Sequence, residues 1–137
     1  MSFILDNSVA VAWCFADEQT PPVMELLERV TETGAHAPLL WPLEALNALL
    51  VAERRGRVNG ERRRQLAGFL RDLPVSLDPD TAGEAWTATA RLAERHSLSM
   101  YDAAYLELAA RRNLPLATRD NTLRTAAAAI GLALLGT

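Results

Sequence analysis

SMYDAAYLELAARRNLPLATRDNTL, residues 99–123, is the stretch of sequence that decides the fold. Its pattern predicts an apolar helix, a turn near Asn113, a short buried strand over 116–118 and the start of another helix. Asp102 falls in the first turn of the earlier helix, and Asp120 follows the strand. Both positions lie at helix N-termini, where backbone N–H groups and the helix dipole favour negative charge. In a parallel α/β fold such positions share one edge of the sheet, so we expect these two acids to face the same crevice.

The length and composition predict one globular domain over residues 1–137. Half of the 137 residues are hydrophobic, which is enough to bury a sizeable core. The sequence contains no apolar run near the roughly 20 residues that span a bilayer, and its start lacks the pattern of an export signal. Cys14, the one cysteine, has no partner for an internal disulfide and lies in an apolar run, which favours a packing residue over a reactive thiol. We therefore expect a reduced, cytoplasmic protein.

Short apolar segments alternate with helical patterns along the whole chain. Strands are predicted at 3–5, 35–38, 75–77 and 116–118, with a last apolar run over 132–135. Helices are predicted between them, including one that begins at a Thr81–Glu84 capping box and ends near Arg95. This alternation is typical of an α/β domain with a mainly parallel sheet.

One predicted helix is apolar nearly all round. Between Ala45 and Ala52 only Asn47 is polar, so the pattern implies burial on more than one side. The helix either lies in the centre of the domain or contacts another chain.

Two further acids follow the other predicted strands. Asp6 comes after the first strand, and Glu44 lies in the first turn of the helix after the second. Each acid also has a purely structural explanation, because Asp is a common N-cap, Ser99 and Asp102 match a capping box, and the dipole favours Glu44. In a parallel sheet, however, all of these acids would lie along its carboxyl edge, the usual ligand site of such folds.

Four carboxylates at one edge would repel each other. A pair about 4 Å apart costs on the order of 4 kcal/mol at an effective dielectric constant of 20. Protonation can relieve this repulsion, and so can a hard divalent cation, for which oxygen-only ligands favour Mg²⁺ or Mn²⁺ over zinc. His36 falls within a predicted strand and His96 near a helix C-terminus, and the sequence supports no Ser-His or Cys-His pairing for nucleophilic catalysis.

Four motifs in register resemble those of PIN-domain nucleases, in particular the VapC toxins of toxin–antitoxin pairs. These are FILDNSV, the E-x-x-N of Glu44 and Asn47, YDAAYLELA and LATRD, and together they extend over essentially the whole chain. The resemblance implies a five-stranded parallel sheet of order 3-2-1-4-5, a Mg²⁺- or Mn²⁺-dependent endoribonuclease, a homodimer and a cognate antitoxin. Carried over by position, it makes Asp6, Glu44, Asp102 and Asp120 the catalytic and metal-binding acids. Ser8 and Thr118 match its small hydroxyl positions.

The metal would activate a water for phosphodiester hydrolysis, with Asp6 and Asp102 as its direct ligands. Asn47 would orient Glu44 or a metal-bound water, the alternative being a buried amide that satisfies backbone groups. Two rival functions use the same residues: a DNA nuclease or phosphatase, and a binding module with the fold but no turnover. The Ala45–Ala52 helix is the candidate surface for the dimer or the antitoxin.

The basic residues are unevenly distributed. All fourteen are arginine, and six lie between Arg54 and Arg64, although the formal net charge of the chain is −3. A negative net charge mildly disfavours a nucleic-acid partner, whereas an arginine cluster suits phosphate. The candidate RNA-binding residues are Arg54, Arg55, Arg62, Arg63 and Arg64; the alternative is a solvated helix end.

Overall fold

A computed structural model describes residues 2–137 and contains a five-stranded sheet in which every pairing is parallel. The strand order is β3-β2-β1-β4-β5, as the resemblance predicted. The strands are β1 (Ile4–Leu5), β2 (Ala35–Pro38), β3 (Val75–Asp78), β4 (Leu116–Ala117) and β5 (Leu134–Leu135). The first strand therefore lies in the centre of the sheet, and the topology brings the ends of β1 and β4 side by side.

The helices fall close to their predicted positions. They are α1 (Asn7–Ala12), α2 (Pro21–Thr33), α3 (Trp41–Arg54), α4 (Gly60–Arg71), α5 (Thr81–Glu84), α6 (Ala90–His96), α7 (Met100–Arg112) and α8 (Asn121–Ala129). A 3₁₀ turn, Ala16–Glu18, follows α1, and a π-helical turn, Ala85–Thr89, joins α5 to α6.

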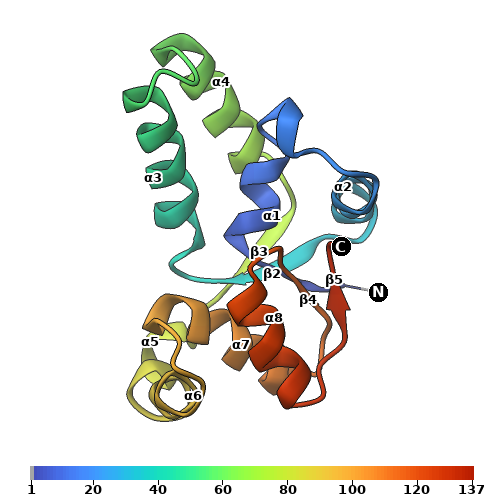
Figure 1. The fold of residues 1–137 in the computed structure, drawn as a ribbon, viewed down its shortest axis with the longest axis vertical. Coiled ribbons are helices and arrows are strands. Elements are labelled where there is room, and N and C mark those ends of the chain that lie inside the picture. The colour runs from blue at the N-terminus through green and yellow to red at the C-terminus, as the bar shows by residue number, and fades with distance from the viewer. Residues whose placement is uncertain (1) are drawn as a thin grey trace.

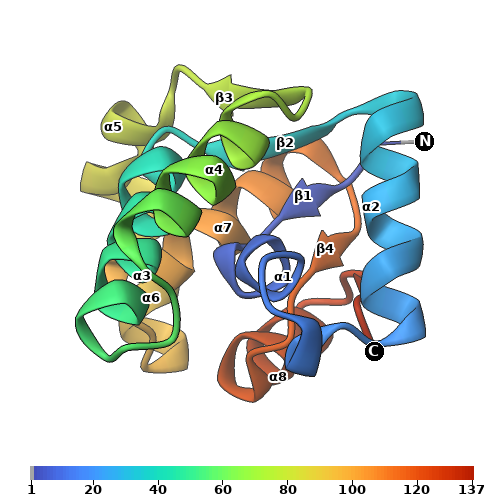
Figure 2. The same cartoon turned by 90° about the horizontal axis from the view of Figure 1, so that it is seen from above.

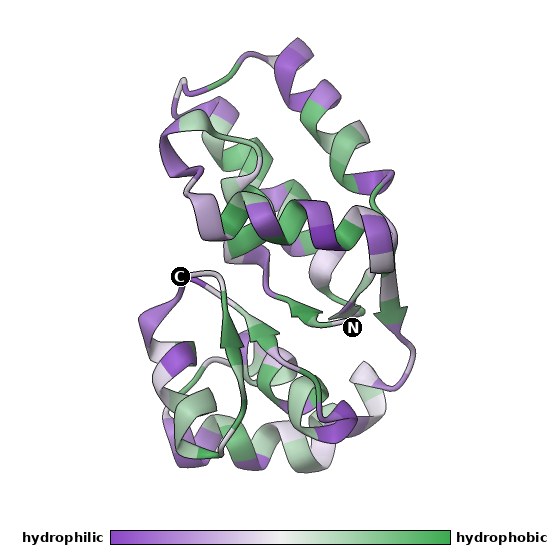
Figure 3. Cartoon of the chain, turned by 90° about the vertical axis from the view of Figure 1, so that its right-hand side faces the viewer, coloured by the Kyte–Doolittle hydropathy of each residue, from purple (hydrophilic) through white to green (hydrophobic). Residues whose placement is uncertain are grey.

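Helix α7 is the most deeply buried helix of the domain. The seven consecutive residues 103–109 are all buried, and α7 contacts β1, β2 and β4. Helices α3 and α4 pack against each other as a hairpin at one end of the molecule, whereas α5 and α6 lie at the other end (Figure 1). Helix α1 lies above the strands and α7 below them in Figure 1, and Figure 2 shows β1 between β2 and β4. The strands are hydrophobic along most of their length, as expected for a sheet covered by helices (Figure 3).

The predicted Thr81–Glu84 capping box is wrong. The Thr81 hydroxyl donates to the backbone oxygen of Asp78 at 2.9 Å and accepts the backbone N–H of Leu39 at the same distance, so it does not cap its own helix. Its bond to Leu39 instead fastens β3 to the loop that leads into α3. The predicted single helix up to Arg95 is also interrupted, because the chain widens into the π-helical turn before α6.

Asp78 extends β3 by one residue beyond the strand predicted over 75–77, and it is buried. Its side chain is 1% exposed and receives the Arg111 guanidinium at 2.6 Å, while Arg111 also binds Glu107 at 2.8 Å. Burial alone would raise the pKa of Asp78, but the hydrogen bonds and charge of Arg111, together with hydrogen bonds from Asp80 and Thr81, outweigh burial and lower it. This ion cluster fastens the edge strand β3 to the C-terminal half of α7.

Cys14 is buried, as predicted, and burial raises the pKa of its thiol to about 11. Among residues 2–137, no helix is both long and apolar enough to cross a membrane.

Candidate metal centre

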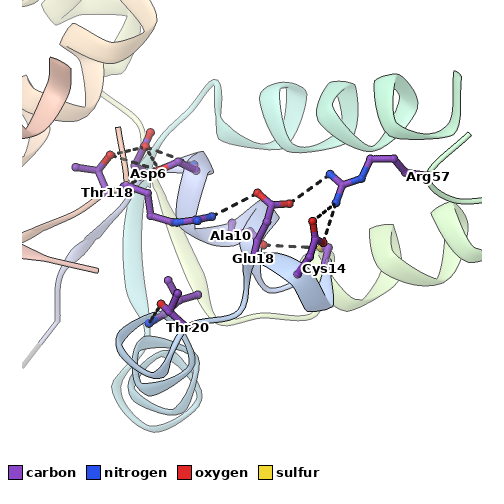
Figure 4. A network of polar contacts seen from close by, with 11 residues as sticks. Asp6, Ala10, Cys14, Glu18, Thr20, Arg57 and Thr118 are labelled. Carbon is purple, nitrogen blue, oxygen red and sulfur yellow. Dashed lines mark hydrogen bonds and ion pairs between the residues drawn. The ribbon is translucent and has the colours of Figure 1, made fainter. Parts of the chain in front are cut away.

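Asp6 follows β1 directly and is the N-cap of α1. It is the one fully buried residue among the four predicted acids. Its side chain is 5% exposed and accepts the backbone N–H of Ser8 as the N-cap of α1. The same oxygen, Oδ2, accepts the hydroxyls of Ser8 at 2.6 Å and Thr118 at 2.8 Å (Figure 4). Burial raises the pKa of Asp6 despite these hydrogen bonds, which lower it. Capping and membership of the acidic site are thus compatible roles of one side chain.

The two hydroxyls hold the ends of β1 and β4 together. Ser8 Oγ accepts the backbone N–H of Arg119 at 2.9 Å, and Thr118 Oγ1 accepts that of Asp120 at 3.1 Å. Each hydroxyl therefore accepts a backbone N–H of the β4–α8 loop and donates its own proton to Asp6. The predicted hydroxyl positions lie beside Asp6, in contact with it.

Asp102 and Asp120 approach the same place from α7 and α8. Asp120 caps α8 through the Thr122 N–H at 2.9 Å, and Ser99 caps α7 through the Asp102 N–H at 3.1 Å. The pKa of Asp102 is raised to about 6, first by burial, then by the charges of Asp6, Asp120 and Glu44, and by a hydrogen bond with Asp120. Asp102 is therefore close enough to the other three predicted acids to be affected by their charges.

Glu44, in the first turn of α3, is half-buried and accepts the Tyr105 hydroxyl on Oε1 at 2.6 Å. Burial raises its pKa, the Tyr105 bond lowers it, and the charge of Asp6 raises it further. Sequence reasoning missed Tyr105. A signal was available, since a phenol within the apolar α7 pattern needs a hydrogen-bond partner, but its partner is 61 residues away.

The donor set suits a hard divalent cation in its chemistry, because its side chains offer carboxylate and hydroxyl oxygens. Among residues 2–137, however, no group of three or more His, Cys, Asp or Glu side chains is arranged to hold a metal ion. Interaction with Asp120 raises the pKa of Asp102, so proton binding at Asp102 would relieve part of the repulsion. A cation that replaced this proton would require the carboxylates to close in.

A chain of ion pairs leads away from Asp6 and was not predicted. Arg119 binds Glu18 at 3.4 Å, and Glu18 binds Arg57 at 3.3 Å (Figure 4). Arg57 also binds Asp17 at 3.0 Å and stacks over the Phe15 ring. The ion pairs connect the β4–α8 loop, through the 3₁₀ turn, to the turn after α3.

The predicted arginine group lies at the tip of the α3–α4 hairpin (Figure 1). Arg63 is paired with Glu53 at 2.5 Å, whereas the other four candidates are exposed: Arg54, Arg55, Arg62 and Arg64. At 1.5 Å per residue, the ten residues from Glu44 to Arg54 place the tip about 15 Å along α3 from the acids.

Asn47 is exposed, so the alternative of a buried amide is wrong.

Comparisons with known proteins agree with this architecture. The PIN domain family model matches residues 3–129. None of the curated proteins compared matches the chain significantly. Among solved structures, PAE2754 from Pyrobaculum aerophilum is 22% identical, with a TM-score of 0.71 over 98% of this chain and 89% of its own. VapC20 from Mycobacterium tuberculosis, described as a sarcin–ricin loop cleaving toxin, is 16% identical, with a TM-score of 0.61 over 95% of each chain. A toxin–antitoxin complex from Klebsiella pneumoniae is 15% identical, with a TM-score of 0.56 over 86% of each chain.

The crowding of carboxylates gives a stability prediction. Asp102 binds its proton more tightly in the folded chain than in the unfolded one, so metal-free wild-type protein should lose stability as the pH rises from about 4 to about 6. Asp102→Asn removes this charge, and we expect it to stabilise the metal-free chain at pH 7 by on the order of 1 kcal/mol, since solvent screens this half-buried side chain, and by little at pH 4. Urea denaturation in EDTA at both pH values measures the difference. An Asp102→Asn variant less stable than wild type at pH 7 would contradict the proposed crowding.

Proposed function

Because the chain belongs to the PIN-domain family, we propose that it is a Mg²⁺- or Mn²⁺-dependent endoribonuclease and the toxin of a toxin–antitoxin pair. The observation that carries the proposal is the placement of Asp6, Glu44, Asp102 and Asp120 at helix N-termini along the carboxyl edge of the sheet. They lie close enough together for the charges of the other three acids to raise the pKa of Asp102. A cluster of mutually repelling carboxylates is costly to the fold, and cation binding is the function that uses it. The RNA substrate, the metal and the homodimer are expectations from the family resemblance.

In this mechanism the chain's own residues hold and orient the metal. Asp6 and Asp102 would bind it directly, and Glu44 and Asp120 would complete the site, directly or through water. The Ser8 and Thr118 hydroxyls both donate to Oδ2 of Asp6, so Oδ1 would be the oxygen that binds the cation. When bound, the metal supplies charge neutralisation at the phosphate and a water of lowered pKa. No protein general base is then required.

Asp102→Asn tests the proposal directly. The variant removes a metal ligand while its amide keeps the size of the side chain, so we expect a loss of metal-dependent RNA cleavage of at least about a hundredfold. Because the same variant is expected to fold more stably without metal, lost activity cannot be attributed to unfolding. The assay follows cleavage of labelled RNA in Mg²⁺, in Mn²⁺ and in EDTA.

Competition in the same assay distinguishes the rival functions. Inhibition by unlabelled RNA, but not by single-stranded DNA or a small phosphoester, supports a ribonuclease. A wild-type chain that gains thermal stability from Mg²⁺ but cuts none of these substrates would be a binding module. If Asp102→Asn retained metal-dependent RNA cleavage, the assignment of the site would be wrong.

The exposed arginines at the tip of the α3–α4 hairpin are proposed to bind RNA phosphates at a distance from the acids. Arg62 and Arg64 are exposed and belong to α4, whereas Arg63 is neutralised by Glu53. Cations about 15 Å from the acids would hold the strand on one side of the scissile bond.

Charge reversal tests the arginine contact. We expect Arg62→Glu with Arg64→Glu to weaken single-stranded RNA binding and to reduce the slope of log K against log salt by about 1.4, because two phosphate contacts are lost. The matched control is Arg91→Glu with Arg95→Glu, which changes net charge equally on the exposed side of α6. Equal slopes for the two double variants would remove the hairpin tip from the RNA path.

The antitoxin is proposed to dock in an apolar groove between α3, α4 and β3. The groove has a volume of about 590 Å³, and its lining includes Trp41, Leu46, Leu70 and Leu77. Arg64 and Arg71 also line it, so it suits an apolar segment flanked by acidic residues. A protein partner is supported by the toxin–antitoxin complex among the similar structures.

Two leucines of α3 provide a matched pair for testing the groove. Leu46 lines it and is 43% exposed, whereas Leu43 is 76% exposed and is not part of its lining. Binding of the cognate antitoxin should weaken at least about tenfold in Leu46→Glu and little in Leu43→Glu. Calorimetric titration measures both affinities. A larger loss in Leu43→Glu would place the antitoxin elsewhere on α3.

A further inference from the structure

Tyr105 connects α7 to the acid that α3 contributes. Its side chain is 0% exposed, and its hydroxyl donates to Oε1 of Glu44 at 2.6 Å. Tyr105 lies one turn after Asp102 on the same face of α7, so this helix supplies both a carboxylate and a hydrogen-bond donor to the site.

The hydrogen bond from the Tyr105 hydroxyl makes the two carboxylate oxygens of Glu44 unequal, because only one of them accepts it. A phenol carries one proton to donate, and at neutral pH it is protonated in its ordinary state. Oε1 receives this proton within a half-buried environment, so turning the carboxylate away from Tyr105 would leave a buried hydroxyl without a partner. Among the residues that the structure describes, Oε2 of Glu44 accepts no such hydrogen bond from α7.

We propose that Tyr105 is a positioning residue that makes Glu44 a one-oxygen donor to the metal centre and thereby favours Mg²⁺ over larger cations. Mg²⁺ requires near-ideal octahedral geometry with single oxygens, whereas Ca²⁺ accepts bidentate carboxylates and irregular coordination. Tying up one oxygen of Glu44 suppresses the bidentate arrangement. The inference rests on the proposed metal-dependent function and names a determinant of its cation.

A purely structural hydroxyl would affect stability but not the choice of cation. The discriminating quantity is therefore the ratio of Mg²⁺ to Ca²⁺ affinity, measured by calorimetric titration of the full chain with each cation. Tyr105→Phe removes the hydroxyl and keeps the buried aromatic ring that α7 contributes to the core. Tyr101→Phe is the matched control, since it removes a hydroxyl from the same helix at a side chain that is 62% exposed.

We expect Tyr105→Phe to lower Mg²⁺ affinity about tenfold, the range seen when a group that orients a metal ligand is lost. Ca²⁺ affinity should be unchanged or higher, so the Mg²⁺-to-Ca²⁺ ratio falls at least about tenfold. Tyr101→Phe should leave the ratio unchanged. A ratio that is the same in Tyr105→Phe and wild type would overturn the proposal.

A second variant changes Glu44, the acceptor of the hydrogen bond, so this test does not depend on whether Tyr105→Phe folds. The Glu44→Gln amide has a single oxygen, which the Tyr105 hydroxyl would occupy, so this variant should lose as much Mg²⁺ affinity as Glu44→Ala. Glu44→Gln with Mg²⁺ affinity near that of wild type would contradict the one-oxygen role.

The wild-type titration separates this inference from the proposed function. Wild-type protein that binds Mg²⁺ and cleaves RNA, together with an unchanged ratio in Tyr105→Phe, overturns the role of Tyr105 alone. Wild-type protein that binds neither Mg²⁺ nor Mn²⁺ overturns the proposed function and this inference with it.

Discussion

The mutual repulsion of carboxylates at the carboxyl edge of the sheet is the constraint on which the rest of the structure depends. Asp6 is buried at the end of the central strand, and its charge acts on Asp102 together with those of Asp120 and Glu44. Such a cluster opposes folding, so the surrounding structure must hold it in place. Hydroxyls from Ser8 and Thr118, a phenol from Tyr105 and four helix N-termini supply that support.

Two of the acids are part of the support as well as of the cluster. Asp6 and Asp120 cap their own helices, and the same side chains belong to the acidic cluster. This economy follows from the parallel sheet, because each strand ends where a helix begins and the helix dipole stabilises the carboxylate at that point. A structural explanation of each acid therefore does not compete with a functional one.

Rigidity away from the acids comes from the long buried helix α7. Residues 103–109 are buried against the sheet, and the Asp78–Arg111–Glu107 ion cluster fastens the far half of α7 to the edge strand β3. Breaking such a buried cluster would leave carboxylates without compensation, which is costly. The position of Asp102 thus depends on contacts made at the opposite end of its own helix.

The sequence by itself determined the order of strands and helices, the caps at Ser99 and Asp120, and the four acids, because periodicity and capping are local properties of the chain. The resemblance added the strand order. Local patterns could not show that Asp78 is buried in an ion cluster, that Thr81 binds Leu39, or that Tyr105 binds Glu44 across 61 residues. Those contacts join segments that are distant in the chain, and only the packing of α7 against the sheet and α3 decided which polar groups meet.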